Sequence, residues 1–229
     1  GALPYADNLA RLVVVSPDSA LVPKKEVMRV LCPGGTAVIA GKKTVKPWPE
    51  TLDEWPQHFY GADNNAVSRD QVVGPPRRIQ WMDSPVWSRS HMGISTIASL
   101  VTCNGRLFSI IDTAPIKMAK LRGRWQLIAG DTFNGKLLWK RPLGPWGWRQ
   151  WSRQRYEGKD WTVVRGSRTD VPGQNQRLIV AGGERLYTTL SYRGPLSVLD
   201  AASGELLATV DVTDGTIVRE KFSPNAWHE

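Results

Sequence analysis

Apolar runs and glycine turns recur in the second half of the chain. Ile97–Phe108 and Gln176–Tyr187 each consist of an apolar run, a turn that contains glycine, and a second apolar run. Short apolar runs separated by such a turn are typical of β-hairpins. The two segments lie 79 positions apart, so the same hairpin is predicted to occur twice.

A ten-residue phrase follows each of these hairpins. Asp131–Lys140 and Asp200–Thr209 both open with aspartate, have glycine at the fifth position (Gly135 and Gly204) and continue as an apolar run. Aspartate favours the start of a tight turn, and glycine tolerates the left-handed backbone that such a turn requires. The phrase therefore predicts a second hairpin, which completes a four-stranded β-unit in each copy. The phrases are 69 positions apart, so the first copy is expected to hold ten extra residues within Ile111–Arg124.

Repetition of a four-stranded unit is typical of a β-propeller or a solenoid. A closed propeller needs about four to eight such blades. Two recognisable blades, with a third degenerate one near residues 77–87, are too few to close a ring. We therefore expect residues 77–229 to form an incomplete propeller of at least two blades, and the chain to be a piece of a larger protein.

Residues 1–41 follow a different pattern. The hydrophobic run Leu9–Val15 is typical of a buried parallel strand, and Pro23–Leu31 has apolar residues at helical spacing. Cys32–Gly35 is expected to end this helix before a second short strand at Thr36–Ala40. Strand, helix and strand in this order predict an α/β domain over residues 1–41. Lysines, prolines and a tryptophan then predict a stiff, basic connector over residues 42–76.

The composition is that of a globular protein with an excess of positive charge. Of 229 residues, 41% are hydrophobic and 22% are charged, and the formal net charge of +9 favours acidic partners. No apolar stretch reaches the about 18 residues of a transmembrane helix, so no membrane span is predicted, and no signal peptide is visible. Cys32 and Cys103 are too few for a disulfide framework, and both are expected to be buried free thiols.

The segment Arg141–Arg168 separates the two copies and is called the Trp/Arg loop below. Its candidate ligand-binding residues are Trp146, Trp148, Arg149, Trp151, Arg153 and Arg155. Aromatic rings stack on sugars and guanidinium groups pair with sulfate, carboxylate or phosphate, so an anionic polysaccharide or another protein is the expected partner. In the alternative interpretation, the tryptophans wedge the loop against the propeller and the arginines are solvated. The sequence has no zinc-finger, helix-turn-helix or RNA-binding signature, which disfavours nucleic acid.

Motifs for catalysis or metal binding are weak. His58 has one carboxylate, Glu54, at metal-ligand spacing, and His91 has none, so hydrogen-bonding roles are expected for both histidines. Gly34 and Gly35 are expected to mark the end of a helix and not a phosphate-binding loop. The sequence therefore predicts neither a catalytic residue nor a metal site.

Two segments of the α/β domain resemble a known enzyme family. Leu3–Asn8, followed by a hydrophobic strand, and Glu26–Gly35 resemble the later half of a class I methyltransferase that uses S-adenosylmethionine (SAM). The resemblance implies a Rossmann-like fold in which Asp7 and Asn8 lie toward the cofactor. In the alternative interpretation, these two residues form the turn before a strand. The glycine-rich loop and the acidic residue that hold the cofactor in that family have no counterpart in these residues.

The repeated unit resembles the PQQ-like β-propeller repeat of quinoprotein dehydrogenases. In that repeat the Asp-x-x-x-Gly turn is followed by a tryptophan that docks between adjacent blades. Trp139 occupies this position in the first copy, and Ala208 replaces it in the second. Catalytic quinoproteins also carry adjacent cysteines and a calcium site, and the sequence has neither, so quinone binding within these residues is disfavoured.

A methyltransferase-like segment joined to such blades resembles a group of large bacterial proteins that are common among planctomycetes. Members of that group tend to begin with an export signal, which implies a periplasmic or extracellular location. The sequence as a whole favours a non-catalytic binding or scaffold module. The alternative is part of an enzyme, either a SAM-dependent methyltransferase or a PQQ-dependent dehydrogenase, completed by flanking sequence. Neither cofactor is supported within this chain.

Overall fold

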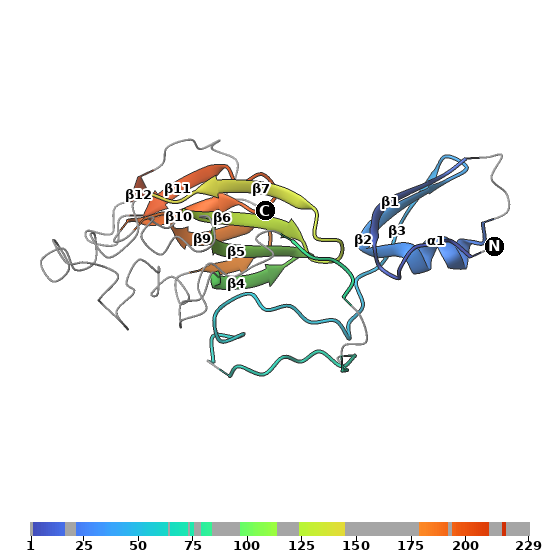
Figure 1. Cartoon of the computed structure of the whole chain (residues 1–229), viewed down its shortest axis with the longest axis horizontal. Coiled ribbons are helices and arrows are strands. Elements are labelled where there is room, and N and C mark those ends of the chain that lie inside the picture. The colour runs from blue at the N-terminus through green and yellow to red at the C-terminus, as the bar shows by residue number, and fades with distance from the viewer. Residues whose placement is uncertain are drawn as a thin grey trace, which may run out of the picture.

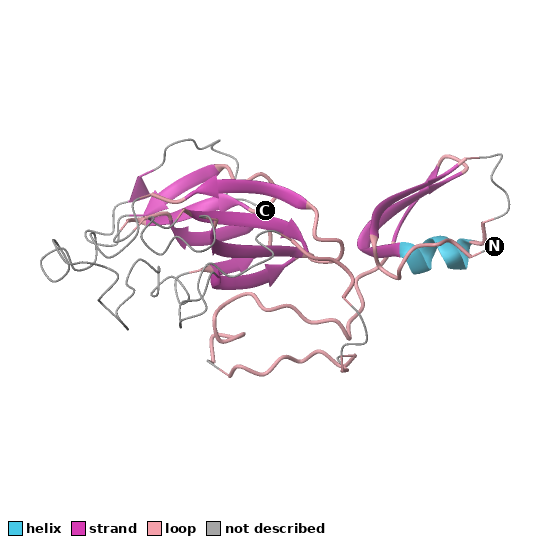
Figure 2. Cartoon of the chain, in the orientation of Figure 1, coloured by secondary structure: helices cyan, strands magenta, loops and turns pink. Residues whose placement is uncertain are grey.

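The structure is a computed structural model that describes residues 2–16, 22–63, 65–72, 74–75, 79–83, 97–113, 124–144, 179–191, 194–210 and 217–218. Within these ranges the chain is mainly β, with three sheets and a single helix (Figure 1, Figure 2). No helix in the described part of the chain is long and apolar enough to cross a membrane.

The first sheet contains a strand–helix–strand unit. Its elements are, in chain order, β1 (Ala10–Val15), α1 (Lys24–Val30), β2 (Leu31–Ile39) and β3 (Lys42–Val45). β1 and β2 are parallel, and α1 is the crossover that a parallel pair requires. β3 adds to β2 in the antiparallel direction. Val27, Leu31 and Ala37 form a small core between α1 and the sheet. The predicted order of strand, helix and strand is confirmed, and its assignment to a methyltransferase-like domain stays a prediction.

The first sheet differs from the expectation in three details. β2 begins directly after α1, and Cys32–Gly35 is an irregularity within this strand instead of a separate turn, with Gly34 at a φ of +70°. Residues 42–45 form β3, so the sheet extends into the predicted connector. Leu12 and Val14 are 61% and 66% exposed, because α1 covers the opposite face of β1.

The second and third sheets are antiparallel meanders with the same strand order. The second comprises β4 (Ile97–Cys103), β5 (Arg106–Asp112), β6 (Trp125–Asp131) and β7 (Leu137–Pro142). The third comprises β8 (Val180–Gly182), β9 (Arg185–Thr189), β10 (Leu196–Asp200), β11 (Leu206–Val210) and β12 (Ile217–Val218). The prediction of two four-stranded units is confirmed, and β12 is an additional outer strand.

The strand registers of the two sheets also correspond. In the second sheet the residues paired across the strands are Val101, Phe108, Ala129 and Trp139. In the third sheet they are Val180, Tyr187, Val198 and Ala208. These rows are related by the offsets of 79 and 69 that the sequence shows. The two sheets are therefore structural copies of one unit.

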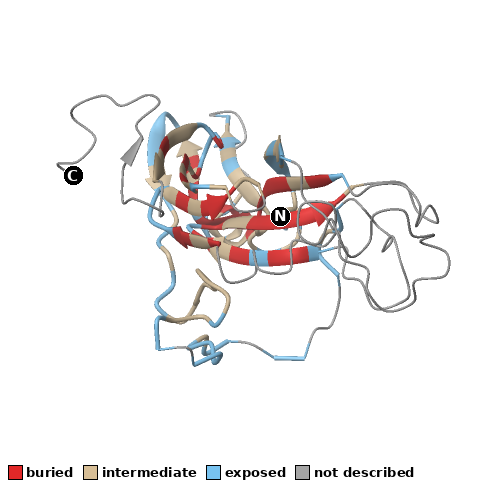
Figure 3. Cartoon of the chain, turned by 90° about the vertical axis from the view of Figure 1, so that its left-hand side faces the viewer, coloured by how far each residue is buried: buried red, intermediate tan, exposed pale blue. Residues whose placement is uncertain are grey.

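The main core lies between these two sheets. Val101, Phe108 and Ala129 of the second sheet share a buried cluster with residues of the third sheet, namely Ala181, Leu186 and Leu199. All six are at most 2% exposed, and the buried positions follow the middle of the strands (Figure 3). Each sheet buries one face against the other, so the copies stabilise each other.

Candidate functional site

The aspartates of the two repeated phrases hold their turns in the same way. Asp131 Oδ1 accepts the amides of Phe133 at 2.8 Å and Asn134 at 3.2 Å. Asp200 Oδ1 accepts the amides of Ala202 at 3.1 Å and Ser203 at 2.8 Å. In each turn the glycine amide donates to the aspartate carbonyl at 2.8 Å. The predicted equivalence of the two turns is confirmed.

An indole packs on each of these turns. Trp139 of β7 donates its Nε1–H to the carbonyl of Ala201 at 3.1 Å, and a Cβ added at Gly204 would lie 2.6 Å from its ring. Trp81 makes the same contact with the turn of the second sheet: its Nε1–H donates to Thr132 at 2.9 Å, and a Cβ at Gly135 would lie 2.5 Å from its ring. The docking role of Trp139 is confirmed, and Trp81 is its counterpart on the turn of the second sheet, although residues 79–83 form no strand.

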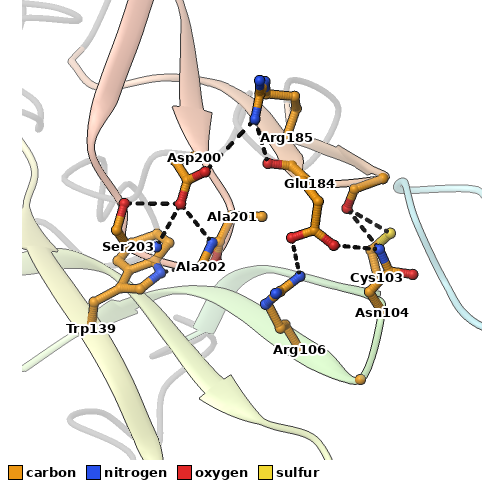
Figure 4. Close-up of polar contacts among 12 residues, drawn as sticks. Cys103, Asn104, Arg106, Trp139, Glu184, Arg185, Asp200, Ala201, Ala202 and Ser203 are labelled. Atoms are coloured by element: carbon orange, nitrogen blue, oxygen red, sulfur yellow. Dashed lines mark hydrogen bonds and ion pairs between the residues drawn. The ribbon is translucent and has the colours of Figure 1, made fainter. Parts of the chain in front are cut away.

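Two arginines at equivalent positions have different partners. Arg185 pairs with Asp200 across β9 and β10, and their side chains approach to 3.7 Å. Arg106 pairs with Asp131 across β5 and β6 in the same register, yet its guanidinium lies 2.9 Å from the carboxylate of Glu184 in the third sheet (Figure 4). The second sheet thus contributes its arginine to the contact with the third.

Arg11 of β1 takes the place that Arg106 leaves at Asp131. Its Nε–H donates to Asp131 Oδ2, and its Nη2 donates to the carbonyl of Gly105 at 2.7 Å. The same guanidinium lies 5.5 Å from the centre of the Phe133 ring, a cation–π geometry. Trp48 packs edge-on against Phe133. These contacts join the first sheet to the second at the turn that also receives Trp81.

A second row of contacts runs along the hairpin turns between β4 and β5 and between β8 and β9, which lie beside the aspartate–glycine turns at the same end of the sheets. The carboxylate of Glu54 accepts the amides of Asn104 and Gly105, each at 2.8 Å. Asn104 in turn donates its Nδ2 to the carbonyl of Gly183 at 3.0 Å and to Glu184 at 3.1 Å (Figure 4). Each turn is therefore held by a side chain from the segment before it in the chain.

Burial and hydrogen bonding shift the acidity of several groups. Burial raises the pKa of the Asp200 carboxyl, but the hydrogen bonds from Ser203 and Ala202 outweigh it and hold that pKa below its ordinary value. Burial raises the pKa of the Cys32 and Cys103 thiols, and both are free and buried, as the sequence predicts. Neither thiol has the depressed pKa of a reactive cysteine.

Asp7 and Asn8, the residues that the resemblance places toward a cofactor, are both engaged within the first sheet. Asp7 lies 2.5 Å from Arg29, and Asn8, at a φ of +56°, accepts Lys46 Nζ at 2.6 Å. The position of Asn8 before β1 agrees with the turn interpretation. A cofactor could hydrogen-bond to these two side-chain oxygens only in competition with Arg29 and Lys46.

The basic connector is partly turned inward. Lys46 donates to Asn8, and also to the carbonyls of Met28 and Leu31, both at 2.7 Å, where it caps the end of α1. Burial lowers the pKa of this ammonium. Lys46 is therefore a structural residue, whereas Lys42 and Lys43 remain exposed.

The six candidate ligand-binding residues of the Trp/Arg loop lie outside the described residues, as does His91. The start of the loop, residues 141–144, is described, and the described chain resumes at Ile179. At its start, Leu143 donates to Trp125 at 3.0 Å and Gly144 to Leu190 at 2.8 Å, and Ile179, beyond its end, is fully buried. The described chain before the candidate residues is therefore β7 and the two residues that follow it, and the described chain resumes directly before β8.

Other chemistry in the described residues is limited. The ring of His58 packs 4.2 Å from that of Phe59, and His58 lines a shallow cavity of about 210 Å³ with residues 97–100. Within the described ranges, no group of three or more His, Cys, Asp or Glu side chains could hold a metal ion. The chain matches no protein-family model and no curated protein.

Proposed function

We propose that the chain is a non-catalytic binding or scaffold module built on PQQ-like propeller blades. The observation that carries this proposal is the indole packed on the aspartate–glycine turn, which Trp81 and Trp139 repeat in successive units. A contact that recurs from unit to unit suits sheets that stack in series and present their loops side by side. Function in such folds resides in the loops.

The ligand in this proposal is an anionic polysaccharide outside the cytoplasm, held by the Trp/Arg loop. Trp146, Trp148 and Trp151 supply rings for stacking on sugars, and neighbouring arginines supply paired charges for sulfate or carboxylate. At the start of the loop, Leu143 and Gly144 donate hydrogen bonds to Trp125 and Leu190. The extracellular location rests on the family resemblance.

The test is retention on an immobilised anionic polysaccharide such as heparin, eluted with a salt gradient. The variant Arg149→Ala/Arg153→Ala/Arg155→Ala should elute at lower salt and lose about tenfold or more in affinity, since each charge-assisted hydrogen bond contributes about 1.5–3 kcal/mol. The control variant Lys24→Ala/Lys25→Ala/Lys42→Ala removes the same charge from exposed positions of α1 and β3. If the two variants elute at the same salt concentration, the weaker retention arises from net charge alone and the proposal is refuted.

A further inference from the structure

The outer edges of the second and third sheets are equivalent in the repeat, but they are paired differently. β12 adds to the edge of β11, where Thr209 pairs with Val218 and Val210 with Ile217. The repeat offset of 69 places Lys140 and Arg141 of β7 at the positions of Thr209 and Val210. No strand of the described part of the chain pairs with the outer edge of β7.

The backbone of β7 presents hydrogen-bonding groups on this edge. Leu143 donates its amide to Trp125 at 3.0 Å, so this pair is hydrogen-bonded across β6 and β7. Hydrogen-bonded and non-hydrogen-bonded pairs alternate along an antiparallel ladder. The N–H and C=O of Lys140, three residues earlier, therefore point away from β6. The equivalent residue of β11, Thr209, pairs with β12 on this side.

The side chains around the β7 edge are exposed and apolar, with positive charge between them. Leu137 and Leu138 are 46% and 40% exposed, while the equivalent Leu206 and Leu207 of β11 are only partly exposed. The flanking lysines, Lys136 and Lys140, are both exposed and replace Glu205 and Thr209 of the third sheet. The β7 edge thus exposes more of its two leucines and carries more positive charge than the edge that already carries a strand.

We propose that the outer edge of β7 binds an extended acidic segment of a partner protein, which adds to the sheet as an antiparallel strand opposite Lys140 and Arg141. Backbone hydrogen bonds supply affinity in this mode of recognition, and pockets for alternate side chains supply specificity. Apolar residues of the partner would cover Leu137 and Leu138, and its carboxylates would pair with Lys136 and Lys140. Lysines and Pro142 at the edge oppose pairing with a second copy of the same cationic strand. The site thereby selects an acidic partner.

The proposal is tested with a fluorescein-labelled eight-residue peptide of alternating glutamate and valine, titrated with the intact protein and followed by fluorescence anisotropy. The peptide should bind saturably, and its binding should shift backbone amide NMR signals of residues 138–141. Lys136→Glu/Lys140→Glu should weaken binding by about tenfold or more through charge repulsion. The control Lys42→Glu/Lys43→Glu, which makes the same charge change on β3, should bind as the unchanged protein does.

A second pair of measurements separates strand addition from simple charge attraction. A peptide of the same sequence with N-methylated backbone amides at its two central glutamates keeps the charge but cannot donate the ladder hydrogen bonds to β7, and should not bind. Lys140→Pro removes the outward N–H of β7 while the bonds to β6 are kept, and should abolish binding. The proposal would be overturned if the N-methylated peptide bound equally well, if the β3 control lost as much binding, or if the first peptide did not bind.

Discussion

Replacing Gly204 with alanine perturbs the contact between the second and third sheets at a single carbon atom. Gly204 has a φ of +73°, and an added Cβ would lie 2.6 Å from the ring of Trp139. The left-handed conformation costs an L-residue about 1–2 kcal/mol. Forcing an extra carbon into a packed contact costs about 1–3 kcal/mol more. The free energy of unfolding should therefore fall by about 2–5 kcal/mol, the sum of these two costs.

Gly183 provides a matched control within the same sheet. Its φ is +55°, but no atom lies within 4 Å of the position where a Cβ would be added. Gly183→Ala should therefore incur the backbone cost alone, about 1–2 kcal/mol. The difference between the two alanine variants measures what the indole contributes at Gly204.

The assay is urea-induced unfolding followed by circular dichroism, with a double-mutant cycle. In a Trp139→Ala background the clash is absent, so Gly204→Ala should cost no more than Gly183→Ala does in the unchanged protein. Equal losses for the two glycine variants in the unchanged protein would refute the reasoning. So would a cost at Gly204 that is independent of Trp139, since the strain would then not arise from the indole.

Two further predictions concern the charged contacts. Arg11→Met should lower the free energy of unfolding by about 3 kcal/mol, because it leaves the buried Asp131 carboxylate without its cation. Arg185→Met should lower the free energy of unfolding by less than about 1 kcal/mol, because its pair with Asp200 is longer, at 3.7 Å, and partly exposed. Similar losses for the two arginine variants in thermal or urea unfolding would contradict this difference. Hydrogen bonds from Arg29 lower the pKa of Glu26 from 4.5 to about 2. The ionised Glu26 therefore stabilises the folded state fully above pH 4.5, and this contribution to the free energy of unfolding is lost as the pH falls toward 2. Glu26→Gln should remove that part of the acid-induced loss of stability, and an unchanged pH profile of unfolding would count against it.

The repeated sheets could be predicted from the sequence because their signals are local. An aspartate and a glycine at fixed spacing set each turn, and apolar runs set the strands on either side. The position of Trp139 within this pattern sufficed to predict its docking. Trp81 could have been found in the same way, because Gln80-Trp81 lies in the region where a degenerate third unit is expected.

The contacts between units could not be predicted in this way, because they join residues far apart in the chain. Arg11 and Asp131 are separated by 120 positions. Arg106 and Arg185 occupy equivalent positions in the repeat, yet only the arrangement of the sheets decides that Arg106 pairs with Glu184. The positive charge of the connector was likewise misleading for Lys46, whose ammonium caps α1 instead of facing solvent.

The central claim is that the second and third sheets are copies of one unit, each receiving an indole on the glycine of its turn. The most direct test is a nuclear Overhauser spectrum of the labelled protein. The Hα protons of Gly135 and Gly204 should show contacts to the rings of Trp81 and Trp139, respectively, and both should be shifted upfield by the ring currents. Hα signals of either glycine at unperturbed positions, with no contact to its tryptophan, would contradict the account.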